Sequence, residues 1–280
     1  MTAFVDYWVR RTGVADVALA GGIFENVKLN QRVRELASVA AVSVFPHMSD
    51  GGLAAGAALA ASGGRPAPLP TIYLGASYDE ETIRAELTRA GVRYERPADI
   101  ADAVAEALAA GEVVPRFTGA MEYGPRALGH RSIYFRADDP SANDWLNKRL
   151  GRSEFMPFAP MTTDEAADRF FVGLDGARFA ARFMTMCFDC TPEMKRLAPG
   201  CVHVDGTARP QVVRREDCPD AHAILTAGER RGRPPILLNT SFNMHEEPIV
   251  MSPADAIGAW RAAGFRCLAI GPFLATAGAA

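Results

Sequence analysis

Residues 62–70 read SGGRPAPLP and divide the chain into two unequal parts. Two glycines and three prolines in nine positions are typical of a linker, because such residues disfavour both helices and strand ladders. About 60 residues precede this stretch and about 200 follow it. The composition therefore predicts a first unit over 1–61, a linker over 62–71 and a second unit over 72–276.

The first unit has the pattern of alternating strands and helices. A short apolar run over 14–20 ends at Gly21-Gly22, which is typical of a buried strand followed by a turn. Residues 28–40 are predicted to be helical, 42–45 extended and 52–61 helical. Two strands and two helices are too few to cover both faces of a sheet. We therefore expect this unit to be part of a larger domain.

The second unit mixes helix and strand signals without a regular alternation. Asp79 is predicted to cap a helix that ends before Gly91. The other expected helices are 102–110, 143–150, 163–171 and 252–263, and the expected strands are 71–74, 112–117, 236–238 and 267–270. The fold class predicted for the chain is α/β, of the α+β type for the second unit.

Composition excludes several classes of protein. Hydrophobic residues make up 49% and charged residues 22%, which excludes a disordered chain, a collagen and a coiled coil. Thirty Lys plus Arg against 33 Asp plus Glu give a formal charge of −3, so no nucleic-acid partner is expected. Lysine occurs only at 28, 148 and 195, and the preference for arginine favours recognition of carboxylate or phosphate.

The sequence gives no sign of secretion or of membrane insertion. The amino terminus, MTAFVDYWVRRTG, has no basic segment followed by an apolar one, and the longest apolar run, near 53–61, is too short for a bilayer. Five cysteines include one CxxC, Cys187 to Cys190, without a second pair to complete a zinc set. A cytoplasmic protein with reduced thiols is predicted.

One motif combines arginines with turn residues. Residues 121–133 read MEYGPRALGHRSI, which sets Arg126 and Arg131 five positions apart among glycines and a proline. A stiff loop of this kind can direct two guanidinium groups at one anion. The alternative is a surface loop with solvated arginines, or an internal pair between Glu122 and an arginine.

Two motifs of the first unit admit both a binding role and a structural one. In AGGIFEN, residues 20–26, glycines after a strand would let backbone N–H groups approach a phosphate, but they also occur in plain turns. In HMSDGG, residues 47–52, Asp50 is either a metal ligand or the N-cap of the following helix.

Two further motifs carry polar groups near a predicted strand end. These are HVDGTARPQ, residues 203–211, and NTSFN, residues 239–243, the second directly after the strand 236–238. Polar side chains at the carboxyl end of a strand commonly face a ligand crevice. The alternative is a set of Asx and Ser/Thr turns.

These motifs, with EFMPFAP at 154–160 and LNTSFNMHEEPIV at 238–250, resemble the NodU/CmcH-type O-carbamoyltransferases in type and order. The resemblance runs from about residue 17 to 274. It implies that 1–61 is the end of an actin-like ATPase-type domain and that 72–276 is a YrdC-like domain. Such enzymes form carbamoyl adenylate from carbamoyl phosphate and ATP, and pass the carbamoyl group to a substrate hydroxyl.

The resemblance assigns roles to particular residues. Arg126, Arg131 and Arg209 would supply the positive charge that the phosphates of carbamoyl phosphate and ATP require. Asn239 and Ser241 would hold carbamoyl or phosphate oxygens, and Mg²⁺ would be bound mainly by the phosphates of ATP.

The first unit would supply the remaining contacts. Gly21, Gly22 and Asn26 match the motif near the bound adenylate. Asp50 matches a carboxylate ligand of Fe²⁺ or another divalent metal, but the family's His-rich metal motif is absent from this sequence. Either a separate chain supplies that part, or the sequence is truncated. Apolar surface around 17–19 and 53–59 is then expected to be exposed, which predicts a homo-oligomer or a complementary amino-terminal subunit.

One stretch departs from the family pattern. Positions where family members commonly carry a lysine and two arginines hold Gly151, Ser153 and Met156. Arg152 or Lys148 would then take over a phosphate contact. The alternative function is a catalytically impaired module that binds nucleotide or a partner chain. A role in tRNA modification is a third possibility, against which the charge of −3 argues.

Overall fold

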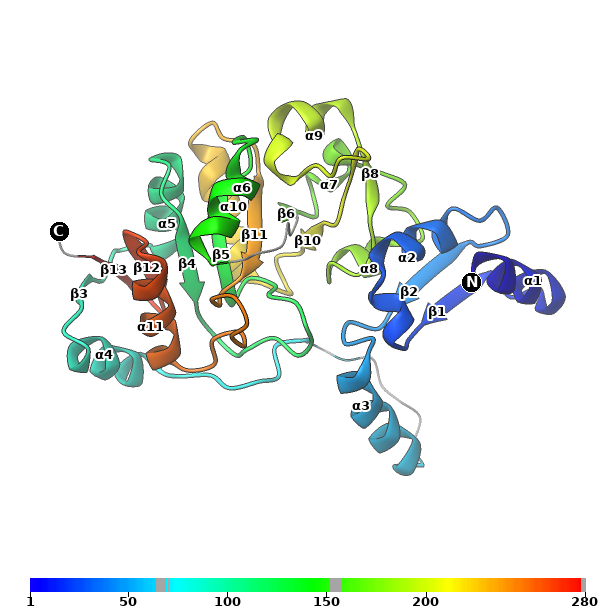
Figure 1. Ribbon diagram of the computed structural model, residues 1–280, viewed down its shortest axis with the longest axis horizontal. Helices are drawn as coiled ribbons and strands as arrows, with labels where there is room; N and C mark the ends of the chain where they lie inside the picture. The colour runs from blue at the N-terminus through cyan, green and yellow to red at the C-terminus, as the bar shows by residue number, and fades with distance from the viewer. Residues whose placement is uncertain (64–68, 70, 152–157, 278–280) are drawn as a thin grey trace.

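The computed structural model describes residues 1–63, 69, 71–151 and 158–277. Within these residues, eight strands form one mixed sheet in the order β10-β6-β11-β5-β4-β12-β13-β3 (Figure 1). Their bounds are β3 Arg93–Glu95, β4 Val114–Phe117, β5 Arg131–Arg136, β6 Ala159–Thr163, β10 Gln211–Val213, β11 Ile236–Ser241, β12 Cys267–Ile270 and β13 Phe273–Thr276. The α/β class predicted from the sequence is confirmed.

Among the four strands at the centre of this sheet, β6, β11, β5 and β4, each runs antiparallel to the next. β11 lies between β5 and β6, with Asn239 opposite Tyr134 on one side and Ala159 on the other. β4 and β5 are also antiparallel, whereas β10 with β6 and β4 with β12 are parallel pairs. Parallel and antiparallel pairs in one sheet are typical of an α+β arrangement.

Helices cover both faces of the sheet, because side chains alternate along each strand. On β5, Ile133 and Phe135 join the larger core cluster, while Tyr134 between them joins the cluster on the opposite face. α5 (Ile100–Ala109) and α10 (Pro219–Arg230) pack side by side on the Tyr134 face (Figure 1). α4 (Glu80–Arg89) and α11 (Pro253–Ala263) contribute to the other cluster.

Helix ends follow the capping signals of the sequence. Asp79 accepts a hydrogen bond from the N–H of Thr82, as predicted, and Asp99 caps α5 in the same way. Ser252 and Asp255 form a capping box at the start of α11, and Gly264 ends that helix in a left-handed conformation.

A long insertion lies between β6 and β10. In the part of the chain that the structure describes, its strands form a separate sheet in the order β7-β8-β9. The elements are α7 Ala167–Phe170, β7 Phe171–Val172, α8 Arg178–Ala181, β8 Phe188–Cys190, α9 Pro192–Leu197 and β9 Thr207–Ala208. A further helix, α6 (Ala142–Arg149), follows β5.

The amino-terminal segment packs on this insertion. It contains α1 Thr2–Thr12, β1 Asp16–Leu19, a 3₁₀ turn Gly22–Glu25, α2 Val27–Arg34, β2 Ala41–Val44 and α3 Asp50–Ala61. The buried side chain of Asn30 donates to the carbonyl of Thr185, and the N–H of Cys187 donates to the carbonyl of Val27. In Figure 1 the blue segment accordingly lies beside the yellow-green insertion.

Three predicted elements differ from the structure. The helix expected over 28–40 ends at Arg34, and the strand expected over 71–74 is only one bridge, between Tyr73 and Glu122. The helix expected over 163–171 forms only over Ala167–Phe170, because Thr163 still belongs to β6, residues 164–166 form a turn and Phe171 begins β7. The predicted linker, 62–71, lies mostly outside the described residues.

The expected exposure of apolar surface is correct for α3 and only partly correct for β1. No residue of α3 is buried, and Leu53 and Leu59 are 65% and 47% exposed. In Figure 1 this helix stands away from the strands. On β1, Leu19 is instead buried and Val17 half-buried, because β1 pairs with β2 and contributes to the core, whereas Ala18 is exposed.

The cysteines and the hydropathy of the helices match what was predicted from the sequence. All five cysteines are free and buried, and burial raises the pKa of Cys187 to about 11 and of Cys190 to about 12. These thiols are therefore poor nucleophiles at neutral pH. Among the described residues, no helix is both long and apolar enough to cross a membrane.

Two leucines offer a matched test of this architecture. Leu268 is fully buried at the centre of β12, whereas Leu59 is exposed on α3. We expect Leu268→Ala to lower the free energy of unfolding by about 2–5 kcal/mol. Leu59→Ala should change it by less than about 0.5 kcal/mol. Urea denaturation of both variants measures the difference. A large loss in Leu59→Ala would mean that α3 packs against another chain in solution.

Candidate functional site

One buried carboxylate shapes the loop between β4 and β5. Oε1 of Glu122 accepts hydrogen bonds from the backbone N–H groups of Leu128 (2.7 Å), His130 (2.9 Å) and Arg131 (3.2 Å). Glu122 is only 7% exposed. A carboxylate that gathers three N–H groups holds the backbone in one conformation, since a buried charge left without these partners would be costly.

Side chains from the sheet hold the carbonyls of the same loop. The hydroxyl of Tyr73 and Nε2 of Gln211 both donate to the carbonyl of Leu128, at 2.9 and 2.6 Å. Nδ2 of Asn239 donates to the carbonyl of Ala127 at 3.2 Å and to Oε1 of Gln211 at 2.8 Å. The loop is therefore fixed through both its donors and its acceptors.

Glycine is required at two turns of this loop. Gly124 and Gly129 have φ of 122° and 121°, which side-chain-bearing residues rarely adopt. At Gly129 a Cβ would also lie 3.1 Å from Sγ of Cys218 and 3.3 Å from the hydroxyl of Tyr134. The glycines of the motif thus allow the loop to pack closely against α10 and β5.

Arg131 has a structural position. It is the first residue of β5 and fully buried, and its guanidinium stacks on the ring of Phe117 at 3.8 Å from the centroid. It donates to the carbonyls of Ala76 at 3.0 Å and Gly119 at 3.2 Å, and also to that of Thr118. Burial lowers its pKa to about 10. Its two Nη groups are thus already bonded to the backbone, and its Nε is buried without a partner, whereas the sequence suggested an anion ligand.

Arg126 is held differently, although it belongs to the same motif. It is half-buried, and among the described residues no side chain or carbonyl accepts a hydrogen bond from it; its Nε is buried without a partner. Burial lowers the pKa of Arg126, and the charge of Glu25 opposes this effect without forming an ion pair. A buried guanidinium without a partner is unfavourable, so this position favours an anion.

Arg209 lies close enough to Arg126 for the two charges to interact. Burial and, to a smaller extent, the positive charge of Arg126 together lower the pKa of Arg209 to about 9. Its one hydrogen bond is a long one, 3.4 Å, to the carbonyl of Met184. Both arginines remain charged at neutral pH. The structure therefore brings together two unneutralised cations from 121–133 and 203–211, which the sequence had proposed for one site.

The predicted phosphate turn of the first segment is largely bonded within itself. The N–H of Gly21 donates to the carbonyl of Met48 at 2.5 Å. Gly22 begins the 3₁₀ turn, and Asn26 caps α2 by accepting from the N–H groups of Lys28 and Leu29. Glu25 of the same turn is close enough to Arg126 for its charge to act on the pKa of that arginine. Their expected role at an adenylate stays a prediction.

The remaining predicted site residues lie in varied surroundings. Oγ of Ser241 donates to Oδ1 of Asn243 at 2.6 Å. Asp50 is exposed as the first residue of α3, and Ser49, not Asp50, holds the N-cap position. Across the described ranges no three His, Cys, Asp or Glu side chains converge as metal ligands. Arg152 and the altered residues 152–157 lie outside the described part of the chain.

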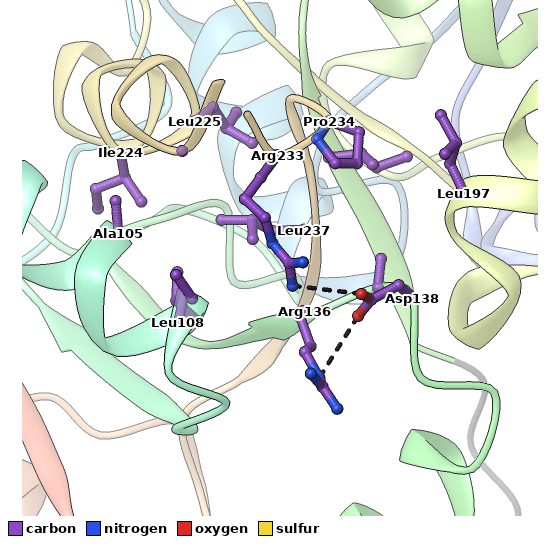
Figure 2. A pocket seen from close by; sticks show the side chains of 14 residues that line it. Ala105, Leu108, Arg136, Asp138, Leu197, Ile224, Leu225, Arg233, Pro234 and Leu237 are labelled. Atoms are coloured by element: carbon purple, nitrogen blue, oxygen red, sulfur yellow. Dashed lines mark hydrogen bonds and ion pairs between the residues drawn. The ribbon is translucent and has the colours of Figure 1, made fainter. Parts of the chain in front are cut away.

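A separate hollow contains two arginines that are paired with a carboxylate, in contrast to Arg126 and Arg209. It lies between α5, α10 and the strands β5 and β11, and Ala105, Leu108, Ile224 and Leu225 form an apolar wall (Figure 2). Asp138 lies between Arg136 and Arg233, at 3.5 and 3.3 Å. Because Asp138 partly neutralises Arg136 and Arg233, this hollow attracts an added anion less strongly than Arg126 and Arg209 do.

The fold and the two unpaired cations define an α/β protein with a candidate anion site. The model of the carbamoyltransferase carboxy-terminus matches residues 105–277, and that of the carbamoyltransferase amino-terminus matches residues 6–59. The chain therefore belongs to the carbamoyltransferase family. The resemblance drawn from the motifs is confirmed.

Relatives from nodulating bacteria support the same assignment. Nodulation protein NolO of Bradyrhizobium diazoefficiens is 37% identical over 95% of this chain and 50% of its own length. Nodulation protein NolNO of Sinorhizobium fredii is 35% identical over 94% of this chain and 40% of its own. The chain spans about half the length, or less, of these relatives. A crystal structure of full-length HypF is 20% identical with a TM-score of 0.40, covering 59% of this chain and 24% of that one.

Sequence reasoning missed three residues that shape the site. Glu122 was considered only as a partner for an arginine side chain, whereas it binds backbone N–H groups. Tyr73 and Gln211 were not singled out, although Gln211 ends the motif HVDGTARPQ. Its place at the end of this motif, two residues after Arg209, is the signal that could have pointed to Gln211, but no local pattern marks Tyr73.

The two arginines of the loop should respond oppositely to truncation. We expect Arg131→Ala to lower the free energy of unfolding by about 2–4 kcal/mol, because several buried carbonyls lose their donor. Arg126→Ala should leave stability unchanged or slightly higher, since an unpaired buried charge is removed.

Added phosphate supplies the second measurement. Phosphate should raise the midpoint of thermal unfolding of the wild-type chain, because it binds the folded state and not the unfolded one. It should not raise the midpoint of Arg126→Ala, because that variant lacks one of the two cations of the site. A stable Arg131→Ala variant, or phosphate stabilisation that survives in Arg126→Ala, would contradict these assignments.

Proposed function

We propose that this chain forms carbamoyl adenylate from carbamoyl phosphate and ATP, as part of an O-carbamoyltransferase that transfers the carbamoyl group to a substrate hydroxyl. The observation that carries the proposal is the pair of half-buried, unpaired arginines, Arg126 and Arg209. Membership of the carbamoyltransferase family supports the choice of carbamoyl phosphate as the anion.

The charges of the substrates fit this pair. Carbamoyl phosphate and ATP repel each other at neutral pH, so their reacting groups approach only beside fixed cations. Arg126 and Arg209 supply two such charges, and in the part of the chain that the structure describes no carboxylate forms an ion pair with either. Their mutual repulsion is relieved when an anion binds, which favours the bound state. Positioning and charge stabilisation are the main contributions a protein makes to transfer at phosphorus.

The other residues have supporting roles in this proposal. Arg131 and Glu122 keep the loop rigid, so that Arg126 is already positioned before the substrate arrives. Mg²⁺ accompanies ATP and is held mainly by its phosphate oxygens. The divalent metal expected at Asp50, the acceptor hydroxyl and a homo-oligomeric or complementary partner belong to the same proposal.

The reaction is measured directly as pyrophosphate release. Carbamoyl phosphate first loses its phosphate to water, which gives carbamate and inorganic phosphate. A carbamate oxygen then bonds to the α-phosphorus of ATP, and the bond from this phosphorus to the β-phosphate breaks, so pyrophosphate leaves. With the purified chain, ATP and Mg²⁺, we expect release that depends on added carbamoyl phosphate. Arg126→Ala should reduce kcat/KM by about 100-fold or more, the size typical of losing one charge-stabilising group.

Arg136→Ala is the matched control, because Arg136 is an arginine of the same sheet that pairs with Asp138 away from the site. It should keep the wild-type rate. A folded chain that binds ATP but releases no pyrophosphate would contradict the proposal and favour the alternative of a nucleotide- or partner-binding module.

A further inference from the structure

Gln211 connects the two segments that carry the unpaired arginines. It is the first residue of β10 and is 2% exposed. Its Nε2 donates to the carbonyl of Leu128, two residues after Arg126, at 2.6 Å. Gln211 itself follows Arg209 by two residues. One side-chain hydrogen bond therefore joins the two guanidinium-bearing stretches, with a short piece of backbone on each side.

The backbone on both sides of this bond is stiff. Pro210 separates Arg209 from Gln211, is buried, and restricts its own φ. On the other side, the N–H of Leu128 is held by Glu122, and the carbonyl of Ala127 by Asn239. A displacement of Gln211 would therefore be transmitted to both arginines rather than absorbed by a flexible link.

Both polar atoms of the Gln211 side-chain amide form hydrogen bonds. While Nε2 donates to Leu128, Oε1 accepts from Nδ2 of Asn239 at 2.8 Å. Asn239 lies in the centre of the sheet on β11 and is 1% exposed. The buried amide pair thus anchors the loop to a central strand, and Nδ2 of Asn239 has no hydrogen free for a ligand, because both bonds go to the protein.

We propose that Gln211 is a positioning residue that sets the spacing of Arg126 and Arg209, and that Asn239 acts with it rather than by donating its amide to a substrate. The physical need is clear: two like charges in a poorly solvated place repel and would separate unless the backbone holds them. The consequence for catalysis rests on the function proposed above, but the consequence for anion binding does not.

The test compares two buried polar residues of neighbouring strands. Gln211→Met keeps the length and volume of the side chain and removes its amide. Thr162→Val is the matched control, because Thr162 on β6 is fully buried and donates to the carbonyl of Pro235 at 2.7 Å, without touching the loop. Both variants lose hydrogen bonds inside the same sheet.

The first readout needs no ligand. Hydrogen exchange of the amides of Leu128, His130 and Arg131 reports whether the loop opens. We expect exchange to rise on the order of tenfold in Gln211→Met, and to change in Thr162→Val only as far as its global stability changes. Exchange that rises equally in both variants, or in neither, would overturn the proposal.

The second readout is affinity for inorganic phosphate, measured by calorimetry. Gln211→Met should weaken binding on the order of tenfold, because the two charges no longer converge, while Thr162→Val binds as the wild type does. Unchanged affinity in Gln211→Met would overturn the proposal. If the wild-type chain binds phosphate in this pattern but releases no pyrophosphate, the proposed function fails and the role of Gln211 stands.

Discussion

The carboxylate of Glu122 is the interaction on which the site depends. By accepting three backbone N–H groups in the interior, it converts a glycine-containing stretch into a loop of one shape. That shape delivers Arg131 into β5 and leaves Arg126 at the junction with the insertion. A buried charge is tolerated only where it has such partners, and here the partners are backbone N–H groups of the loop.

Two arginines five residues apart therefore have opposite surroundings. Arg131 enters a central strand, and its guanidinium bonds to carbonyls of Ala76 and of residues 118–119. Arg126 lies before that strand begins; its charge acts on a second cation, Arg209, and Glu25 is near it without forming an ion pair. Both residues are arginines of the same motif. What distinguishes the structural arginine from the candidate ligand-binding one is therefore whether its guanidinium has hydrogen-bond acceptors in the protein.

Much of the fold could be predicted from local signals. Asp79, Ser252 and Gly264 mark helix ends through bonds made within a few residues, and the structure has them at those places. β5 was missed, because its residues Arg131–Arg136 include two charges and directly follow a loop motif. For the site, Arg126 and Arg209 were predicted together, whereas Tyr73 and Gln211 act through partners 55 and 83 residues away.

The sequence by itself determined the family, the α/β class and the presence of motifs rich in arginine and glycine, because these depend on residue types and their order. Only the tertiary structure decided which arginines remain without a partner. That outcome depends on where β5 begins, on the carboxylate of Glu122 and on the amide pair of Gln211 and Asn239. Charge pairing is a property of spatial neighbours, and these neighbours are distant in the sequence.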